Sequence, residues 1–106
     1  MRIELHKNGL TVTEDMDSIL TTKMNKVEKR LKRYHPEVAD LEIRLDYFDK
    51  LSEFECSLNL KLFKDTLQAK KQGSELRTAV DRSFEVLYRE LENYRVKVNK
   101  NIQAKA

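Results

Sequence analysis

The stretches LEIRLDYF (residues 41–48) and FECSLNLKL (residues 54–62) decide the fold. In both, apolar residues take every second position and polar residues fill most positions between, which is typical of a β-strand with one buried face. A short connection near residues 49–52 separates them, so we predict an antiparallel hairpin. Lys64 and Asp65 form a connection short enough to return a further strand over Thr66–Lys70. The three strands are therefore expected to form a meander.

Segments with the apolar spacing of a helix lie on both sides of this meander in the sequence. Upstream, apolar residues between Thr13 and Tyr34 recur at steps of three and four, Thr13 supplies an N-cap hydroxyl, and Pro36 prevents the helix from continuing. Downstream, a second helix is expected to start at Ser74 and to run almost to Lys100. The two apolar stripes comprise Met16, Leu20, Met24, Val27, Leu31 and Tyr34, and then Leu76, Val80, Phe84, Leu87, Leu91, Tyr94 and Val98.

An opening strand completes the pattern. Ile3 and Leu5 alternate with polar residues, and Asn8-Gly9 ends the strand. The order β-α-β-β-β-α predicts an α+β fold: a four-stranded mixed sheet with both helices packed on one face, the first strand parallel to a later one through a right-handed crossover. We expect a single domain over residues 1–100 and a frayed tail over residues 101–106.

Composition fits a small folded domain. The chain has 106 residues, of which 40% are hydrophobic, with two Gly and one Pro, which argues against a disordered or fibrous protein. No apolar run approaches the roughly 18 residues of a membrane helix, and the first ten residues do not resemble a signal peptide. The single cysteine, Cys56, cannot form an internal disulfide. We therefore expect a cytoplasmic protein without membrane contact.

Charge is distributed unevenly. Residues 23–33 carry six basic side chains and one acid, a local charge of +5; residues 37–55 carry seven acids and two bases, or −5; residues 56–106 carry eleven bases and six acids, or +5. Opposite charges at separate places favour orientation toward a polyanion. Lys70 and Lys71 lie just before the second helix, so the two basic segments could converge on phosphates if the helices pack side by side. A simpler interpretation is also open: the basic residues 23–33 could form a helix face that is only exposed to solvent and binds no partner.

Residue patterns typical of catalysis or metal binding are missing. His6 and His35 are too few for a histidine cluster, and Cys56 has the inward phase of its strand. There is no phosphate-binding glycine loop and no nucleophile elbow. We therefore expect no enzyme, cofactor, metal or small-molecule substrate. Phe48 and Phe63 have the outward phase of their strands. Each could stack on RNA, contact a protein partner, or lie at a distorted sheet edge or under the C-terminal tail, and the sequence does not decide between these roles.

Two stretches carry a resemblance to a known family. VTEDMDSILTTKMNKVEKRLKRY (residues 12–34) resembles the opening "V-T, acid, then helix" motif of the short ribosome hibernation factors, the hibernation-promoting and ribosome-associated inhibitor family. ELRTAVDRSFEVLYREL (residues 75–91) is similar to the "A-I-D … L … R-Q-L" helix of the same family. The likeness covers roughly residues 1–98.

The resemblance implies a fold akin to a double-stranded-RNA-binding domain and a non-catalytic protein, monomeric when free. Such a protein would occupy the mRNA and tRNA region of the small ribosomal subunit and silence translation in stationary phase or stress. Which subtype the chain represents stays open. The resemblance and the local charges together predict a set of side chains that contact rRNA phosphates. These are Lys23, Lys26, Lys29, Arg30, Arg33, Lys70, Lys71, Arg82, Arg89, Arg95 and Lys97.

Two other functions compete with ribosome binding. The acidic hairpin of one copy could meet the basic helix of another, which would make the chain a self-association or protein-interaction module. Alternatively, the basic surface could bind free double-stranded RNA, with similar affinity for a plain duplex and for the ribosome.

Overall fold

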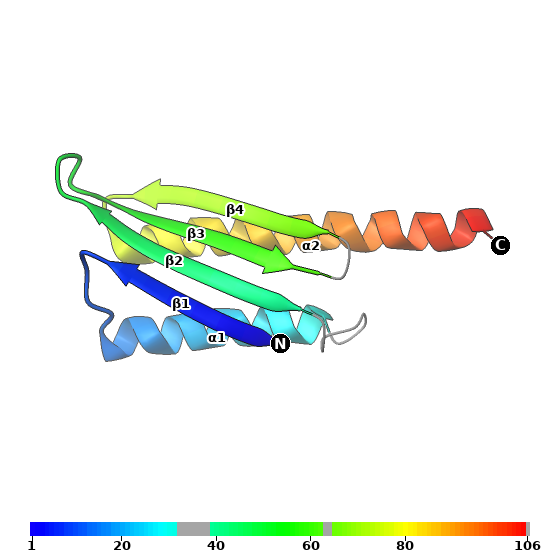
Figure 1. The fold of residues 1–106 in the computed structure, drawn as a ribbon, viewed down its shortest axis with the longest axis horizontal. Coiled ribbons are helices and arrows are strands. Elements are labelled where there is room, and N and C mark those ends of the chain that lie inside the picture. Colours follow the sequence, from blue (N-terminus) through cyan, green and yellow to red (C-terminus); the bar gives the residue numbers. More distant parts are fainter. Residues whose placement is uncertain (32–38, 63–64, 106) are drawn as a thin grey trace.

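The computed structural model describes the backbone of residues 1–31, 39–62 and 65–105, and the side chains of these ranges as far as Tyr94. It confirms the β-α-β-β-β-α order that the sequence predicts (Figure 1). The elements are β1 (Arg2–Asn8), α1 (Glu14–Leu31), β2 (Asp40–Phe48), β3 (Glu53–Lys61), β4 (Thr66–Gly73) and α2 (Leu76–Lys105).

The four strands form a mixed sheet in the order β1-β2-β3-β4. β1 pairs with β2 in parallel, as a crossover through α1 requires, and β2, β3 and β4 form the expected antiparallel meander. The register places Leu41 opposite Leu60 and Leu58 opposite Ala69. Apolar side chains of neighbouring strands therefore share one face of the sheet.

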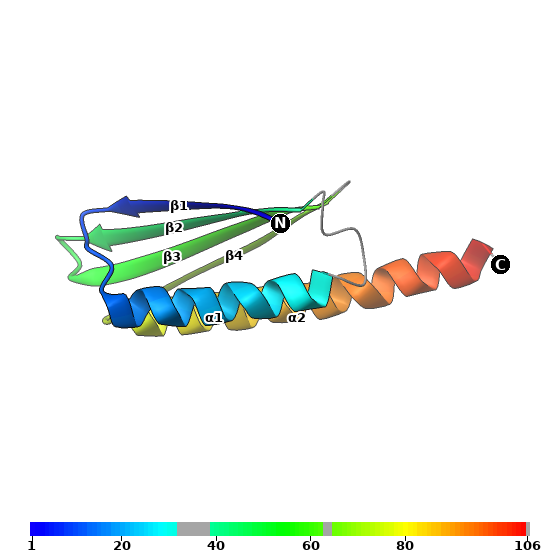
Figure 2. The same ribbon diagram turned by 90° about the horizontal axis from the view of Figure 1, so that it is seen from below.

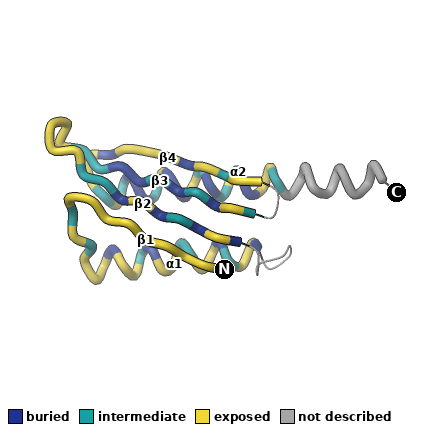
Figure 3. Tube along the Cα trace, in the orientation of Figure 1, coloured by how far each residue is buried: buried dark blue, intermediate teal, exposed yellow. Residues whose placement is uncertain are grey.

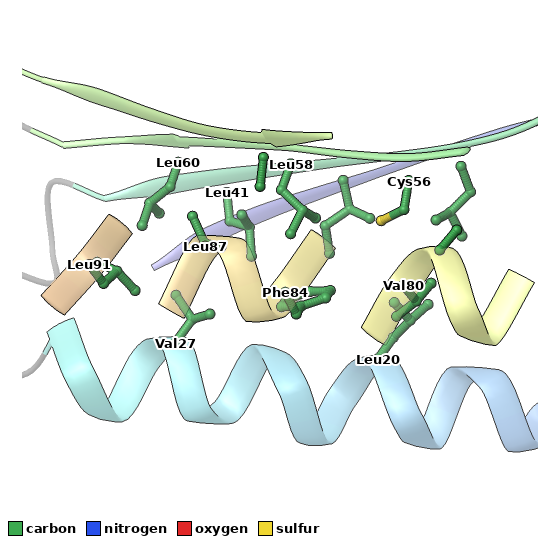
Figure 4. Close-up of a cluster of buried hydrophobic side chains, with 14 of the residues drawn as sticks. Leu20, Val27, Leu41, Cys56, Leu58, Leu60, Val80, Phe84, Leu87 and Leu91 are labelled. Atoms are coloured by element: carbon green, nitrogen blue, oxygen red, sulfur yellow. The ribbon is translucent and has the colours of Figure 1, made fainter. Parts of the chain in front are cut away.

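Both helices cover this apolar face, and the other face is open (Figure 2). The exposed and buried positions alternate along β2 and β3, as Figure 3 shows by colour. Between the layers lies one core cluster, in which Phe84 of α2 is completely buried (Figure 4). Its other fully buried large side chains are Leu20, Val27, Leu31, Leu41, Ile43, Leu45, Cys56, Leu58, Leu60, Val80 and Leu87.

The start of α1 follows from local chemistry. The Met16 amide donates to the Thr13 hydroxyl at 3.2 Å, and the Asp17 amide donates to the Thr13 carbonyl at 2.9 Å. Glu14, Asp15 and Asp17 put negative charge in the first turn, where the helix dipole favours it. The predicted N-cap is confirmed. The predicted C-terminal end, at Tyr34 before Pro36, lies outside the described residues.

The junction between β4 and α2 differs from the expected one. β4 continues to Gly73, and α2 begins at Leu76 rather than at Ser74. The strand approaches the helix closely here: a Cβ atom on Gly73 would lie 3.0 Å from the Thr78 Cβ and 3.1 Å from the Ala79 amide nitrogen. Glycine fits this junction without the shift of a few tenths of an ångström that a side chain would require of these neighbours.

The last helix is longer than the sequence predicted. We expected it to run almost to Lys100, but α2 continues to Lys105 and extends past the sheet (Figure 1). The frayed tail expected over residues 101–106 stays a prediction. Residues 99–105 contain neither proline nor glycine, so nothing in the chain stops the helix near Lys100.

Strand β1 is less buried than its alternating pattern suggests. Ile3 and Leu5 lie opposite the buried Leu41 and Ile43, on the face that the helices cover, yet they are 41% and 38% exposed. β1 has a neighbouring strand on only one side, and α1 covers its outer side incompletely. No residue of β1 is buried.

Candidate nucleic-acid interface

The candidate interface is the outer surface of α1 and α2, which pack against each other on one side of the sheet (Figure 2). Lys26, Lys29 and Arg30 are exposed on α1, at the helical spacing i, i+3, i+4 that puts side chains on one face. Lys26 and Lys29 make no ion pair within the described part of the chain. We call Lys26, Lys29 and Arg30 the basic strip.

Tyr88 of α2 positions the end of this strip. The guanidinium carbon of Arg30 lies 4.5 Å from the centroid of the Tyr88 ring, an arrangement that favours a cation over an aromatic face. The Tyr88 hydroxyl donates to the main-chain oxygen of Lys23 at 3.1 Å, which connects α2 to α1. Burial raises the pKa of Tyr88, although Arg30 opposes the shift, so the hydroxyl remains a donor at neutral pH. No function was predicted for Tyr88 from the sequence.

Lys23 differs from the basic strip because its charge is used within the protein. Its Nζ lies 2.9 Å from a carboxylate oxygen of Asp81, its side chain is only 19% exposed, and it lies 6.0 Å from the centroid of Phe84. Arg77 also approaches Asp81, at 3.7 Å. We therefore assign Lys23 to the α1–α2 contact rather than to the exposed strip.

The basic residues of α2 lie on another side of the helix layer. Arg82 and Arg89 are exposed and seven positions apart, so they share a face of α2 that is turned away from the stripe of Asp81 and Tyr88 against α1. Arg82 donates from Nη1 to the main-chain oxygen of Gln72 in β4 at 3.3 Å. The structure thus provides a second basic group, Arg82 and Arg89, on a different face of α2 from the residues that contact α1.

Lys70 and Lys71 do not point the same way. Lys71 lies opposite Cys56, so it is on the helix side of the outer strand β4, where it is exposed. Lys70 lies opposite Ser57 on the open face and pairs with Glu55 at 3.2 Å. The strand register therefore does not bring both Lys70 and Lys71 together with the basic residues of α1. Arg33, and the side chains of Arg95 and Lys97, lie outside the described residues, as does Phe63.

Glu55 differs from the other carboxylates of the hairpin because it is buried. It is 5% exposed although it is on the open face of the sheet. Gln72 donates to one of its oxygens at 2.8 Å, and Ser57 and Lys70 lie 3.4 Å and 3.2 Å from the other. These partners satisfy the carboxylate, which is what burial of a charge requires.

Cys56 lies in the core as its strand phase predicts. Burial raises the pKa of its thiol from 9.0 to about 11, although a hydrogen bond with Ser83 opposes the shift. The thiol is therefore protonated and unreactive at neutral pH. No helix among the described residues is both long and apolar enough to cross a membrane.

The fold and the site define a class of protein: a small α+β domain that presents basic helical surfaces on one layer and an open sheet on the other. Residues 3–99 match the family described as "Sigma 54 modulation protein / S30EA ribosomal protein". The chain belongs to this family, which confirms the resemblance seen in the sequence.

A curated relative and two solved structures show the extent of the similarity. The ribosome hibernation promotion factor of Staphylococcus aureus (strain COL) is 24% identical over 100 residues, which are 94% of this chain and 51% of that protein. The chain therefore spans about half the length of this relative. A ribosomal subunit interface protein from Coxiella burnetii has a TM-score of 0.66 at 20% identity, over 91% of this chain and 99% of its own. The N-terminal domain of Protein Y from Thermus thermophilus has a TM-score of 0.67 at 18% identity, over 89% and 99%. Both share the fold.

Proposed function

We propose that this protein binds ribosomes and silences translation under stationary-phase or stress conditions. It would do so in the cytoplasm, without catalysis, by occupying the mRNA and tRNA region of the small ribosomal subunit. The observation that carries the proposal is the basic strip, three exposed cations on one face of α1, in a chain that belongs to the S30EA family. Its curated relative is named as a ribosome hibernation promotion factor.

The chemistry of the strip suits phosphates rather than base edges. Lysine ammonium groups contact phosphate as point charges, and the guanidinium of Arg30 can donate two parallel bonds to phosphate oxygens. Its stacking on Tyr88 restricts the guanidinium before binding, which lowers the entropy lost on contact. Such contacts release counterions, so affinity should fall steeply as salt rises.

Arg82 and Arg89 extend the proposed surface along α2. RNA contacted by this layer would meet both the basic strip on α1 and this second group on α2. Phosphate is favoured at both groups, so the two contacts together would orient the protein on the RNA. Lys71 could join the second group, whereas the pairing of Lys70 with Glu55 removes that lysine from the proposal.

Co-sedimentation in sucrose gradients tests the proposal. The wild-type protein should sediment with purified small subunits at low salt and dissociate as salt rises. The triple variant Lys26→Glu, Lys29→Glu, Arg30→Glu should not bind. The matched control reverses three exposed cations away from the helix layer, Arg44→Glu, Lys50→Glu and Lys61→Glu, with the same change in net charge, and should still bind.

Two results would contradict the proposal. The wild-type protein could be absent from ribosomal fractions at every salt concentration, or the control variant could lose binding as completely as the strip variant. Light scattering on nuclease-treated protein separates the alternatives, since self-association without RNA would favour the interaction module. Equal affinity for a plain RNA duplex would favour general double-stranded RNA binding.

A further inference from the structure

Three side chains with metal-binding atoms meet on the open face of the sheet, on the opposite side from the basic strip. Glu4 and His6 lie two positions apart on β1, and Glu42 is the register partner of Glu4 on β2. One ligand atom from each lies within 4.8 Å of the others, and the His6 Nε2 is 3.7 Å from a carboxylate oxygen of Glu4.

We propose that Glu4, His6 and Glu42 bind one divalent transition-metal ion of the zinc class. Atoms no more than 4.8 Å apart lie within about 2.8 Å of a common point, so small side-chain rotations bring them to bonding distances of about 2.0–2.2 Å. An imidazole with two carboxylates suits Zn²⁺ better than Mg²⁺ or Ca²⁺, which select oxygen ligands alone. Water would complete the coordination.

The electrostatics of the open face favour a cation at this point. The carboxylates of Glu4 and Glu42 face each other across paired strands, where like charges destabilise the pair. Arg2 supplies a compensating charge, which approaches Glu4 at 3.3 Å but is 74% exposed. An exposed ion pair of this kind contributes little, so its displacement by a divalent ion is a small cost.

The positive charge of Arg44 should lower the affinity of this site for the metal ion. Arg44 is the register partner of His6 and is exposed, so its charge opposes a second cation nearby. The ligands are themselves half exposed, and three of them leave coordination positions to water. We therefore expect reversible binding, weaker than that of a closed four-ligand structural zinc site.

Occupancy would have a structural effect because the ligands come from two strands. β1 buries none of its side chains, and a bridging ion would attach this edge strand to β2. The site is on the face that the helices leave open, so the inference does not depend on the proposed ribosome function. Sequence spacing could not reveal it, since Glu42 reaches Glu4 only through the register of the parallel pair.

Isothermal titration of the full chain with ZnCl₂ tests the inference. We expect one ion per chain, and affinity at least tenfold lower for His6→Ala and for Glu42→Gln. The chain has two histidines, so His35→Ala is the matched control and should bind as the wild type does. Glu53→Gln, another acid of the open face, should also leave binding unchanged.

NMR spectra of the His6 ring give a second readout that does not depend on heat. Zn²⁺ should shift these resonances in the wild type and in His35→Ala alike. Absence of binding up to millimolar Zn²⁺, or affinity unchanged by His6→Ala, would overturn the inference. Because His6 and Glu42 are outside the core, circular dichroism should find both variants folded.

Discussion

Neutralising two lysines of the basic strip should change how ribosome binding depends on salt. Lys26 and Lys29 are exposed and make no ion pair within the described chain. If each contacts one phosphate, the slope of log affinity against log salt should fall by about 0.7–0.9 per lysine, or about 1.5 for the variant Lys26→Gln, Lys29→Gln. Between about 50 and 200 mM salt, the wild type should lose about tenfold more affinity than the variant.

The measurement is fluorescence anisotropy of labelled protein titrated with purified ribosomes over this salt range. Thermal unfolding of the double variant should stay near that of the wild type, because substitutions at exposed positions without partners change stability by less than about 0.5 kcal/mol.

Lys23→Gln is the internal control and should show the opposite behaviour. It removes the 2.9 Å contact with Asp81 between the helices, so we expect a loss of about 1 kcal/mol in unfolding free energy and an unchanged salt slope. Parallel slopes for the wild type and the double variant would refute the assignment of Lys26 and Lys29. So would a slope reduced by Lys23→Gln, since that result would mean that Lys23 contacts phosphate.

Three further predictions concern stability. Phe84→Ala removes a completely buried ring and should lower the unfolding free energy by about 3–5 kcal/mol in urea titrations; a loss below about 1 kcal/mol would contradict its central place in the core. Thr13→Ala removes the N-cap of α1 and should cost about 1 kcal/mol, with Thr13→Ser close to wild type in the same assay. Burial raises the pKa of Cys56 from 9.0 to about 11, so the folded thiol stays protonated while the unfolded one ionises. The raised pKa therefore stabilises the fold fully below pH 9, and this stabilisation, up to about 3 kcal/mol, is lost as pH rises toward 11. The difference in unfolding free energy between the wild type and Cys56→Ala should change by that amount between pH 9 and pH 11. A difference that stays constant over this interval would argue against the raised pKa.

Periodicity in the sequence was sufficient for the element order and most of the core. The alternation in β2 and β3 and the stripe through Leu20, Val27 and Leu31 each report on one element and its buried face, so they can be interpreted without knowledge of the neighbours. The N-cap at Thr13 is equally local. These features were predicted correctly because their physical causes lie within a few residues of each other.

Features that depend on the relative placement of two elements were not predictable in this way. The pairing of Lys23 with Asp81 depends on the rotation of α1 against α2, and the burial of Glu55 depends on its position beside Gln72 across two strands. A charge count over residues 23–33 treats all its cations alike. Of those it describes, the structure separates Lys23, in an internal contact, from the exposed basic strip, and it places Lys70 on the opposite face.

The low burial of β1 has a consequence for how the molecule opens. β1 buries no side chain and α1 buries Met16, Leu20, Val27 and Leu31, whereas α2 packs directly on β3 and β4. We therefore expect β1 and α1 to open before the rest of the molecule unfolds, as a separate cooperative unit. Amide hydrogen exchange in β1 and α1 should proceed through this partial opening, while amides of β3 should exchange only on global unfolding. Since the basic strip lies on α1, a bound polyanion should slow exchange most strongly in the segment that we expect to open first in the free protein.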